Sequence, residues 1–236
     1  MGVVSTAKCF APFALAAFRR CHPGIDLGLT IANRAMTIEA LRQYDLDFAI
    51  TGRPPDDLPV ETEKIGDHPH VVTARPDHRL ARGRWSPAAL TAETFLMRGR
   101  APAPGPDARP RSGTRALAAR LFAEAGVTPR IGMAIDSNKT IEQAVMAGLG
   151  IALLSAHATA AELADGRLLA LDIDGLPAMR EWFVVRHAEK HLLPAAAALW
   201  RFLAGEGAAY LPVLPATRSR RAGPDRRGIT ADGRGR

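Results

Sequence analysis

The stretch "GVVSTAKCFAPFALAAFRRCHPGIDLGLTIAN", residues 2–33, decides the fold class. It opens with a short apolar run that ends in Ser5 and Thr6, and a helical period follows in which the apolar residues share one face. That face is formed by Phe10, Phe13, Ala14, Ala17, Phe18 and Cys21. The breakers Pro23 and Gly24 end this helix. Leu27, Leu29 and Ile31 then alternate with smaller residues, which predicts a strand. The stretch therefore predicts a β-α-β unit.

The same alternation continues along the chain. A helix is expected over 36–45 and a strand over 46–52, and such a series implies a parallel sheet with right-handed crossovers. A further strand is expected over 70–74. A second set follows, with strands over 93–98, 130–136, 150–155 and 167–173 and helices over 112–126, 137–148 and 156–166. A strand over 180–188 and a helix over 192–207 close the pattern. The fold class is α/β.

Charge lies at two places in the 236-residue chain, whose net charge is +7. Residues 218–236 carry seven arginines against two aspartates, and residues 98–115 carry five against one, so the remainder has a net charge of −2. The body is therefore not basic. Nucleic-acid binding by the Arg-rich tail is an alternative function, and deletion of the tail should abolish it. Twelve residues of helix between Cys9 and Cys21 span roughly 18 Å, too far for a disulfide. We expect a reduced, cytoplasmic protein without a membrane span.

Short polar residues open three of the predicted helices. They are Ser5-Thr6, Ser112-Gly113-Thr114 and Ser137-Asn138. A helix N-terminus presents unpaired N–H groups and the positive end of the helix dipole, which suits a carboxylate or phosphate. Parallel strands bring such sites to one edge of the sheet. Each cluster can also be a simple helix cap, and the sequence leaves both interpretations open.

Signals for catalysis are weak. No phosphate-binding glycine motif and no nucleophile elbow is present. His68 and His70 flank Pro69, but no third metal ligand has a useful spacing. We predict no enzyme, no metal site and no cofactor.

Several motifs in this order resemble one family. They are "GVVSTAKCFAP", "AFRRCHPGIDLGLTIANR", "LDFAITGRPP", "FLMR…SGTRALAARLFAEAG", "IDSNKTIEQAVMAGLGIALLSAH" and "REWFVVRHAEKHLLPAAAALWRFL". Together they are similar to the effector-binding domain of LysR-type transcriptional regulators, most of all to the regulators of the RuBisCO (Calvin-cycle) operon. The resemblance covers about residues 2–212.

The resemblance implies two Rossmann-like subdomains joined by two crossover strands, as in type II periplasmic binding proteins. Subdomain I would comprise residues 1–75 plus 186–212, and subdomain II residues 76–185. Beyond the resemblance, the Arg-, Gly- and Pro-rich composition of the end of the chain predicts a disordered basic tail over residues 213–236. The resemblance also implies a homodimer or tetramer and an effector in the cleft between the subdomains. The effector would be a small anionic metabolite such as a phosphorylated sugar, phosphoenolpyruvate or NADPH. The implied effector-binding residues are Ser5, Thr6, Lys8, Arg98, Ser112, Thr114, Ser137 and Asn138.

Two departures from the family pattern bear on function. The family reads DNA through an N-terminal helix-turn-helix, which is missing from the printed chain. A fragment, a misplaced start or frameshift, and a stand-alone sensor domain remain three explanations. About ten extra residues, near 99–111, separate "FLMR" from "SGTR"; their arginines either attract an anionic effector or keep the loop solvated. A free solute-binding protein and an enzyme on the same fold are the competing functions.

Overall fold

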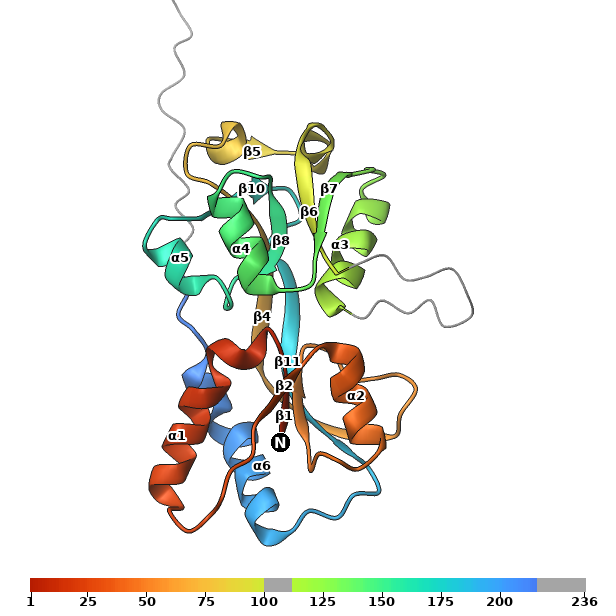
Figure 1. Ribbon diagram of the computed structural model, residues 1–236, viewed down its shortest axis with the longest axis vertical. Coiled ribbons are helices and arrows are strands. Elements are labelled where there is room, and N and C mark those ends of the chain that lie inside the picture. Colours follow the sequence, from red (N-terminus) through yellow and green to blue (C-terminus); the bar gives the residue numbers. More distant parts are fainter. Residues whose placement is uncertain (100–111, 216–236) are drawn as a thin grey trace, which may run out of the picture.

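The computed structural model describes residues 1–99 and 112–215. The expected insertion, apart from Gly99, and the expected tail from residue 216 onward lie outside this part of the chain. Figure 1 shows two lobes stacked along the long axis and joined by two long strands, β4 (Val60–Ala74) and β11 (Ala178–His187). The two crossover strands that the resemblance implied are therefore present.

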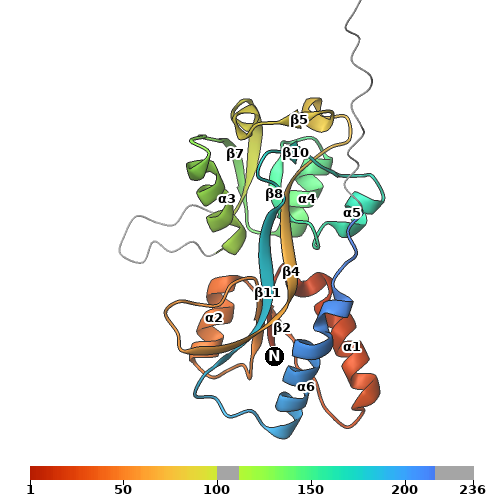
Figure 2. The ribbon, with the colours of Figure 1, turned by 180° about the vertical axis from the view of Figure 1, so that it is seen from behind.

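The first lobe is built on parallel strands from the N-terminal part of the chain. Its elements are β1 (Gly2–Val4), α1 (Ala11–Cys21), β2 (Thr30–Ala32), α2 (Arg34–Arg42), β3 (Ala49–Thr51) and α6 (Pro194–Glu206). β1 pairs in parallel with β2 on one side and β3 on the other. Helices α1 and α6 lie together on one side of these strands, and α2 lies on the other (Figures 1 and 2). This is the β-α-β-α-β unit that the opening stretch predicts.

The second lobe repeats the arrangement with later segments. Its main elements are β6 (Thr94–Arg98), α3 (Gly113–Glu124), β7 (Arg130–Ile135), α4 (Asn138–Met146), β8 (Ala152–Ser155) and α5 (Ala160–Ala164). Three short strands complete it: β5 (Arg84–Trp85), β9 (Leu169–Ala170) and β10 (Asp172–Ile173). Two 3-10 turns, η2 (Arg79–Ala81) and η3 (Pro87–Ala92), also belong to this lobe. β6 pairs in parallel with β7.

The crossover strands make the large sheet mixed rather than parallel throughout. Its order is β2-β1-β3-β11-β4-β8, with β9 beside β4, and β11 runs antiparallel to both β3 and β4. β4 also begins ten residues before the predicted strand over 70–74. Its first part, "VETEKIGDHP", is mostly polar, with Ile65, His68 and Pro69 as its buried positions, and it lacks the apolar alternation of a half-buried strand. Pairing with β11 supplies the backbone hydrogen bonds there.

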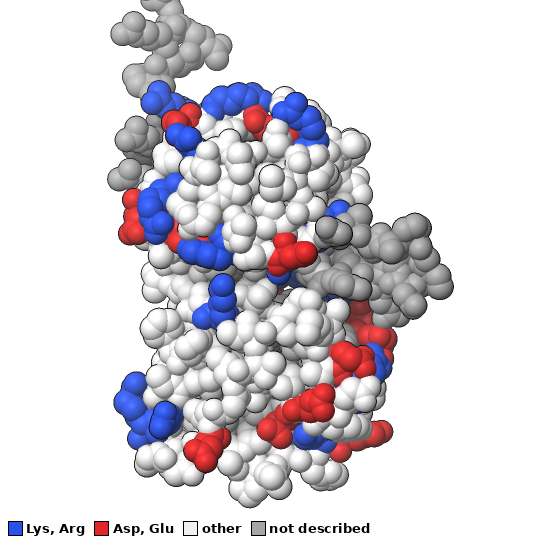
Figure 3. All heavy atoms as spheres, viewed as in Figure 1, with Lys and Arg blue, Asp and Glu red and all other residues white. Residues whose placement is uncertain are grey.

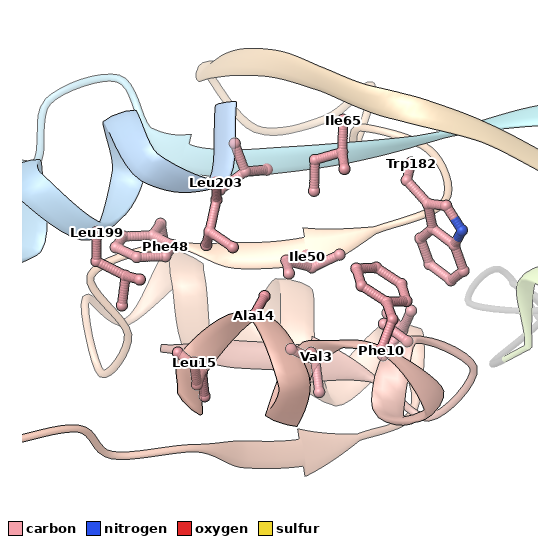
Figure 4. Close-up of a cluster of buried hydrophobic side chains, with 14 of the residues drawn as sticks. Val3, Phe10, Ala14, Leu15, Phe48, Ile50, Ile65, Trp182, Leu199 and Leu203 are labelled. Atoms are coloured by element: carbon pink, nitrogen blue, oxygen red, sulfur yellow. The ribbon is translucent and has the colours of Figure 1, made fainter. Parts of the chain in front are cut away.

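The core of the first lobe lies between its sheet and helices α1 and α6. Val3, Phe10, Phe48 and Ile50 are buried there (Figure 4). Trp182, on β11, closes this core at its end toward the second lobe and is fully buried. Cys9 lies in a 3-10 turn, η1 (Ala7–Cys9), before α1, so the expectation that both cysteines share one helix was wrong. Both cysteines are free. The division at residues 75 and 186 remains a prediction.

Gly150 provides a test of the packing between β6 and β8. Its φ is +153°, and a Cβ there would lie 2.3 Å from the carbonyl oxygen of Thr94. We expect Gly150→Ala to lower the free energy of unfolding by at least about 2 kcal/mol, because the backbone itself must move. Gly166→Ala is the matched control, since Gly166 also has a positive φ but no atom near its Cβ position. Equal losses in urea denaturation of the two variants would contradict the close approach.

Candidate functional site

A polar pocket lies between the lobes, at the carboxyl ends of β1 and β3. Six of the eight predicted effector-binding residues line it: Ser5, Thr6, Arg98, Ser112, Thr114 and Asn138. Ser5 and Thr6 come from the first lobe, and the other four come from the second. All three polar clusters that the sequence suggested therefore contribute to one cleft, although the first is more than 100 residues away from the other two in the chain.

Asn138 connects the two lobes across this cleft. It is buried, its side-chain oxygen accepts a hydrogen bond of 2.8 Å from Arg98 Nε, and its amide donates to Ser5 Oγ at 3.5 Å. The pair Arg98 and Asn138 thus forms one end of the cleft, with Ser5 opposite. A ligand that enters here meets groups from both lobes at once.

Two predicted residues lie outside the pocket. Ser137 caps α4 by accepting a hydrogen bond from the backbone N–H of Thr140 at 3.3 Å, so its hydroxyl performs the structural role that the sequence left open. Lys8 is exposed on η1 and is not part of the pocket wall. Ser112 combines both roles, because it lines the pocket and also caps α3 through the N–H of Arg115.

Three arginines that the sequence analysis did not single out complete the site. Arg34 begins α2, Arg53 follows β3, and Arg180 lies on β11. No acidic residue lines the pocket within the described part of the chain. Arg53 pairs with Asp56 at 2.6 Å, whereas the hydrogen bonds of Arg34 and Arg180 among the described residues go to backbone carbonyls. Positive charge therefore exceeds negative charge inside the cleft.

The pKa values show this excess of charge. Burial and the nearby charges of Arg34, Arg53 and Arg120 lower the pKa of Arg180 to about 10. Burial also lowers the pKa of Arg34 and of Arg98. Nearby acids oppose the effect in both cases: Asp56 and Asp57 for Arg34, and Asp136 for Arg98. Arginine charges that repel one another in a cleft raise its free energy, and a bound anion would remove this repulsion.

The surface shows a different pattern, since acidic side chains gather outside the cleft, over the first lobe near α2 (Figure 3).

Buried histidines form the floor of the pocket. His68 and His70 lie on β4 and line it, and His157 lies behind them, 6.2 Å from His68 between ring centroids. His70 donates from Nδ1 to the carbonyl of His68, and His157 Nδ1 accepts from the indole N–H of Trp182 at 3.2 Å. Burial is the main cause that lowers the pKa of all three rings, and the pKa of His70 falls to about 3. Among the described residues, no group of three or more His, Cys, Asp or Glu could hold a metal ion.

The pKa of His70 predicts how stability depends on pH. The folded chain keeps His70 neutral above about pH 3, while the unfolded chain protonates it below its ordinary pKa near 6.5. Protons therefore favour the unfolded state between pH 6.5 and pH 3, and stability falls as the pH drops through this window. We expect His70 alone to cost about 2 kcal/mol between pH 7 and pH 5. Urea denaturation at both pH values measures the loss of unfolding free energy, and this loss should be smaller by that amount in His70→Asn than in the unsubstituted chain. An identical loss in the two chains would contradict a neutral, buried His70.

A larger cavity of about 290 Å³ lies elsewhere, in the core of the second lobe. Its wall is mostly apolar, and the two carboxylates at its edge, Glu124 and Asp174, already pair with Arg120 and Arg84. Among the described residues, its lining offers no free cationic group to an anion. We therefore take the smaller, arginine-lined cleft as the functional site.

Two lobes, two crossover strands and a polar cleft between them define a ligand-sensing module of the type II periplasmic-binding-protein-like class. The family model described as the LysR substrate binding domain matches residues 1–208. The chain therefore belongs to this family, and the resemblance seen in the sequence is confirmed.

Individual relatives narrow the group. The chain is 54% identical over 218 residues to the HTH-type transcriptional regulator CbbR of Xanthobacter flavus, with 91% of this chain and 62% of that protein covered. It is 45% identical over 203 residues to CbbR of Rhodospirillum rubrum, with 86% and 64% covered. The chain thus spans less than two thirds of the length of these regulators. They are transcription regulators and not enzymes, which agrees with the expected lack of catalysis.

A solved structure shares the fold closely. It is the regulatory domain of CcmR from Synechocystis PCC6803 in complex with 2-PG (2-phosphoglycolate), with a TM-score of 0.78, 33% identity, and 86% of this chain and 93% of that chain covered. No described helix of the present chain has both the length and the apolar character to cross a membrane.

Proposed function

We propose that the chain is the effector-sensing and dimerising part of a LysR-type regulator of carbon-fixation genes. In this proposal, a small phosphorylated, anionic metabolite binds in the cleft between the lobes, and DNA contacts belong to a helix-turn-helix outside the printed sequence. The observation that carries the proposal is the set of four arginines, Arg34, Arg53, Arg98 and Arg180, in a cleft without an acidic residue among those described. Arginine is the side chain best suited to phosphate and carboxylate, because its planar fork donates two parallel hydrogen bonds.

The arginines form two groups, which supports an effector with two anionic ends. Arg34 and Arg53 lower the pKa of Arg180, so these three charges lie within reach of one another. Arg98 donates a hydrogen bond to Asn138, and the charge that acts on its pKa is that of Asp136 rather than those of the three arginines. A metabolite with a phosphate at one end and a carboxylate or second phosphate at the other would use both groups. The 2-PG bound by the CcmR domain has this chemistry.

The small size of the free cavity, about 40 Å³, connects binding to a change of shape. The cavity in the second lobe is larger, at about 290 Å³. We infer that the arginine side chains or the lobes move apart to accommodate a phosphorylated metabolite in the cleft. An effector that binds one arrangement better than another shifts the balance between them. In a full-length regulator this shift would reach the DNA-binding part.

Calorimetric titration of the chain tests the proposed function. 2-Phosphoglycolate, phosphoenolpyruvate and NADPH are the probes, and glycolate, which lacks the phosphate, is the control. We expect at least one phosphorylated probe to bind and glycolate to bind far more weakly. If none of the phosphorylated probes gives heat or raises the melting temperature, the proposed effector class is wrong.

The edges of the two sheets favour assembly with a second copy. β2 and β7 each pair on one side only within the described residues, and Ile31, Ile131 and Met133 are exposed on them. Edge strands with apolar side chains readily pair with another chain unless something covers them. We predict that Ile31→Lys with Met133→Lys lowers the mass measured by sedimentation to that of a monomer. Leu193→Lys, at another exposed apolar position, is the control and should leave the assembly intact.

A further inference from the structure

One nitrogen of His68 lies at the wall of the cleft without a partner. His68 is only 3% exposed, lines the pocket, and its Nδ1 has no hydrogen bond within the described part of the chain. Nδ1 points toward Gly52, another residue of the pocket wall, and a Cβ at that position would lie 2.9 Å from it. The backbone of Gly52 therefore lies close to Nδ1, and a side chain at position 52 would press against this nitrogen. A buried polar atom at the wall of a cleft indicates a missing partner.

The rest of the ring is held firmly, so Nδ1 cannot turn to another partner. The ring of His68 stacks on Trp182 with centroids 3.6 Å apart and an angle of 16° between the planes. Its Nε2 lies 2.9 Å from Ser155 Oγ, at the end of β8. These two contacts fix both the plane of the ring and its rotation in that plane.

The surrounding hydrogen bonds assign the ring proton. Ser155 Oγ accepts from the backbone N–H of Ala158 at 3.4 Å, so its own proton is free to go to His68 Nε2. The ring then carries its proton on Nδ1. With the other tautomer, the Ser155 hydroxyl proton and Nδ1 would both lack a partner. The first arrangement leaves a single unpaired donor, which lies beside Gly52 at the wall of the cleft.

The charges around His68 keep the ring neutral. Burial lowers the pKa of His68 well below its usual value, and the nearby His70, His157 and Arg180 lower it further. The groups that act on its charge are these three, and none of them is an acid. The ring is therefore a donor without a charge of its own, beside the charged fork of Arg180.

We propose that neutral His68, protonated on Nδ1, is a specificity-determining residue of the cleft that donates one hydrogen bond to an unprotonated oxygen of the bound anion. This inference rests on the proposed function and adds a rule for ligand choice. A ligand that presents an O–H or N–H at this place would leave two donors facing each other and would be rejected. The same ring joins the ligand to Ser155 in the second lobe and, through Trp182, to the core of the first.

Two substitutions of His68 distinguish the contributions of Nδ1 and Nε2 to the binding of 2-phosphoglycolate. An asparagine amide lies near the place of Nδ1, whereas a glutamine amide reaches the place of Nε2 and the Ser155 contact. We expect His68→Asn to keep the affinity within about threefold and His68→Gln to lose about tenfold or more. If the unsubstituted chain binds 2-phosphoglycolate and His68→Gln binds it with the same affinity, the inference about His68 is overturned while the proposed function stands. Failure of the unsubstituted chain to bind any phosphorylated probe would overturn the proposed function, and the inference with it.

NMR spectroscopy of the unsubstituted chain distinguishes ligand contact from a purely structural role, because only ligand contact changes the chemical shift of the His68 ring proton. Long-range ¹H–¹⁵N correlation spectra of histidine-labelled chain report which ring nitrogen carries the proton. We expect the Nδ1–H form of His68 without ligand, and a downfield shift of that proton when 2-phosphoglycolate is added, while exposed His191 does not respond. An Nε2–H form in the complex, or an Nδ1 proton that does not shift at saturation, would overturn the proposal.

Discussion

Replacement of Arg180 by methionine is expected to weaken the binding of 2-phosphoglycolate about 100-fold. Burial, and after it the charges of nearby arginines, lower the pKa of Arg180 to about 10, so its charge is poorly compensated in the free chain. A hydrogen bond to a charged group contributes about 1.5–3 kcal/mol, and the upper end of that range corresponds to about two orders of magnitude in Kd. Methionine has a similar apolar stem, so the loss of the charged fork is the main change.

The same substitution should leave the free chain at least as stable as before. Arg180 is partly buried beside Arg34 and Arg53, and its hydrogen bond goes to the carbonyl of Gly113 at 3.3 Å. Removing the charge therefore removes repulsion together with one hydrogen bond. Arg19→Met, on the exposed face of α1, is the matched control and should change neither Kd nor the unfolding midpoint. An unchanged Kd in Arg180→Met would show that the anion does not use this cleft.

Replacement of Trp182 by alanine is expected to lower the free energy of unfolding by about 4 kcal/mol, or the melting temperature by roughly 10 °C. The side chain is fully buried between the lobes. It packs edge-to-face on Phe10 at 5.3 Å, stacks on His68, and donates to His157. Its loss leaves a cavity where the core of the first lobe meets the crossover strands.

Trp182→Ala should also weaken ligand binding, because His68 loses the surface that holds its ring. Trp200→Ala is the control: Trp200 is half-buried on α6 and packs on Phe48 at 5.8 Å, away from the cleft. It should lower stability by less and leave the affinity for 2-phosphoglycolate unchanged. Thermal unfolding and calorimetry on the two variants measure both effects. A Trp182→Ala chain as stable as the Trp200→Ala chain would contradict the role of this residue at the junction.

Much of the fold could be predicted from the sequence because local patterns specify it. The helices over α1, α3, α4 and α6 follow from apolar periodicity with clear breakers, such as Gly126, whose φ is +64° after α3. The first part of β4 could not be predicted, since most of its residues are polar and its few buried positions, such as Ile65 and His68, form no apolar alternation. The antiparallel course of β11 depends on pairing with residues over 100 positions earlier.

The site could be predicted only where it coincides with helix starts. Ser112 and Asn138 stand at such positions, and the structure brings both to the cleft. Arg34 and Arg180 carry no local signal, because an isolated arginine in a sequence is usually a solvated charge. His68 and His70 were noticed only as weak metal ligands, and their burial under the cleft depends on contacts with β8 and Trp182. The signal that was overlooked is Gly52-Arg53, which directly follows a buried strand.

The most direct test of the central claim is a crystal structure of the chain with 2-phosphoglycolate at saturating concentration. We predict that the phosphate and carboxylate groups occupy the cleft between the lobes, with Arg180 at one end and Arg98 and Asn138 at the other. A ligand that is bound outside this cleft, with the cleft itself unchanged, would contradict the account.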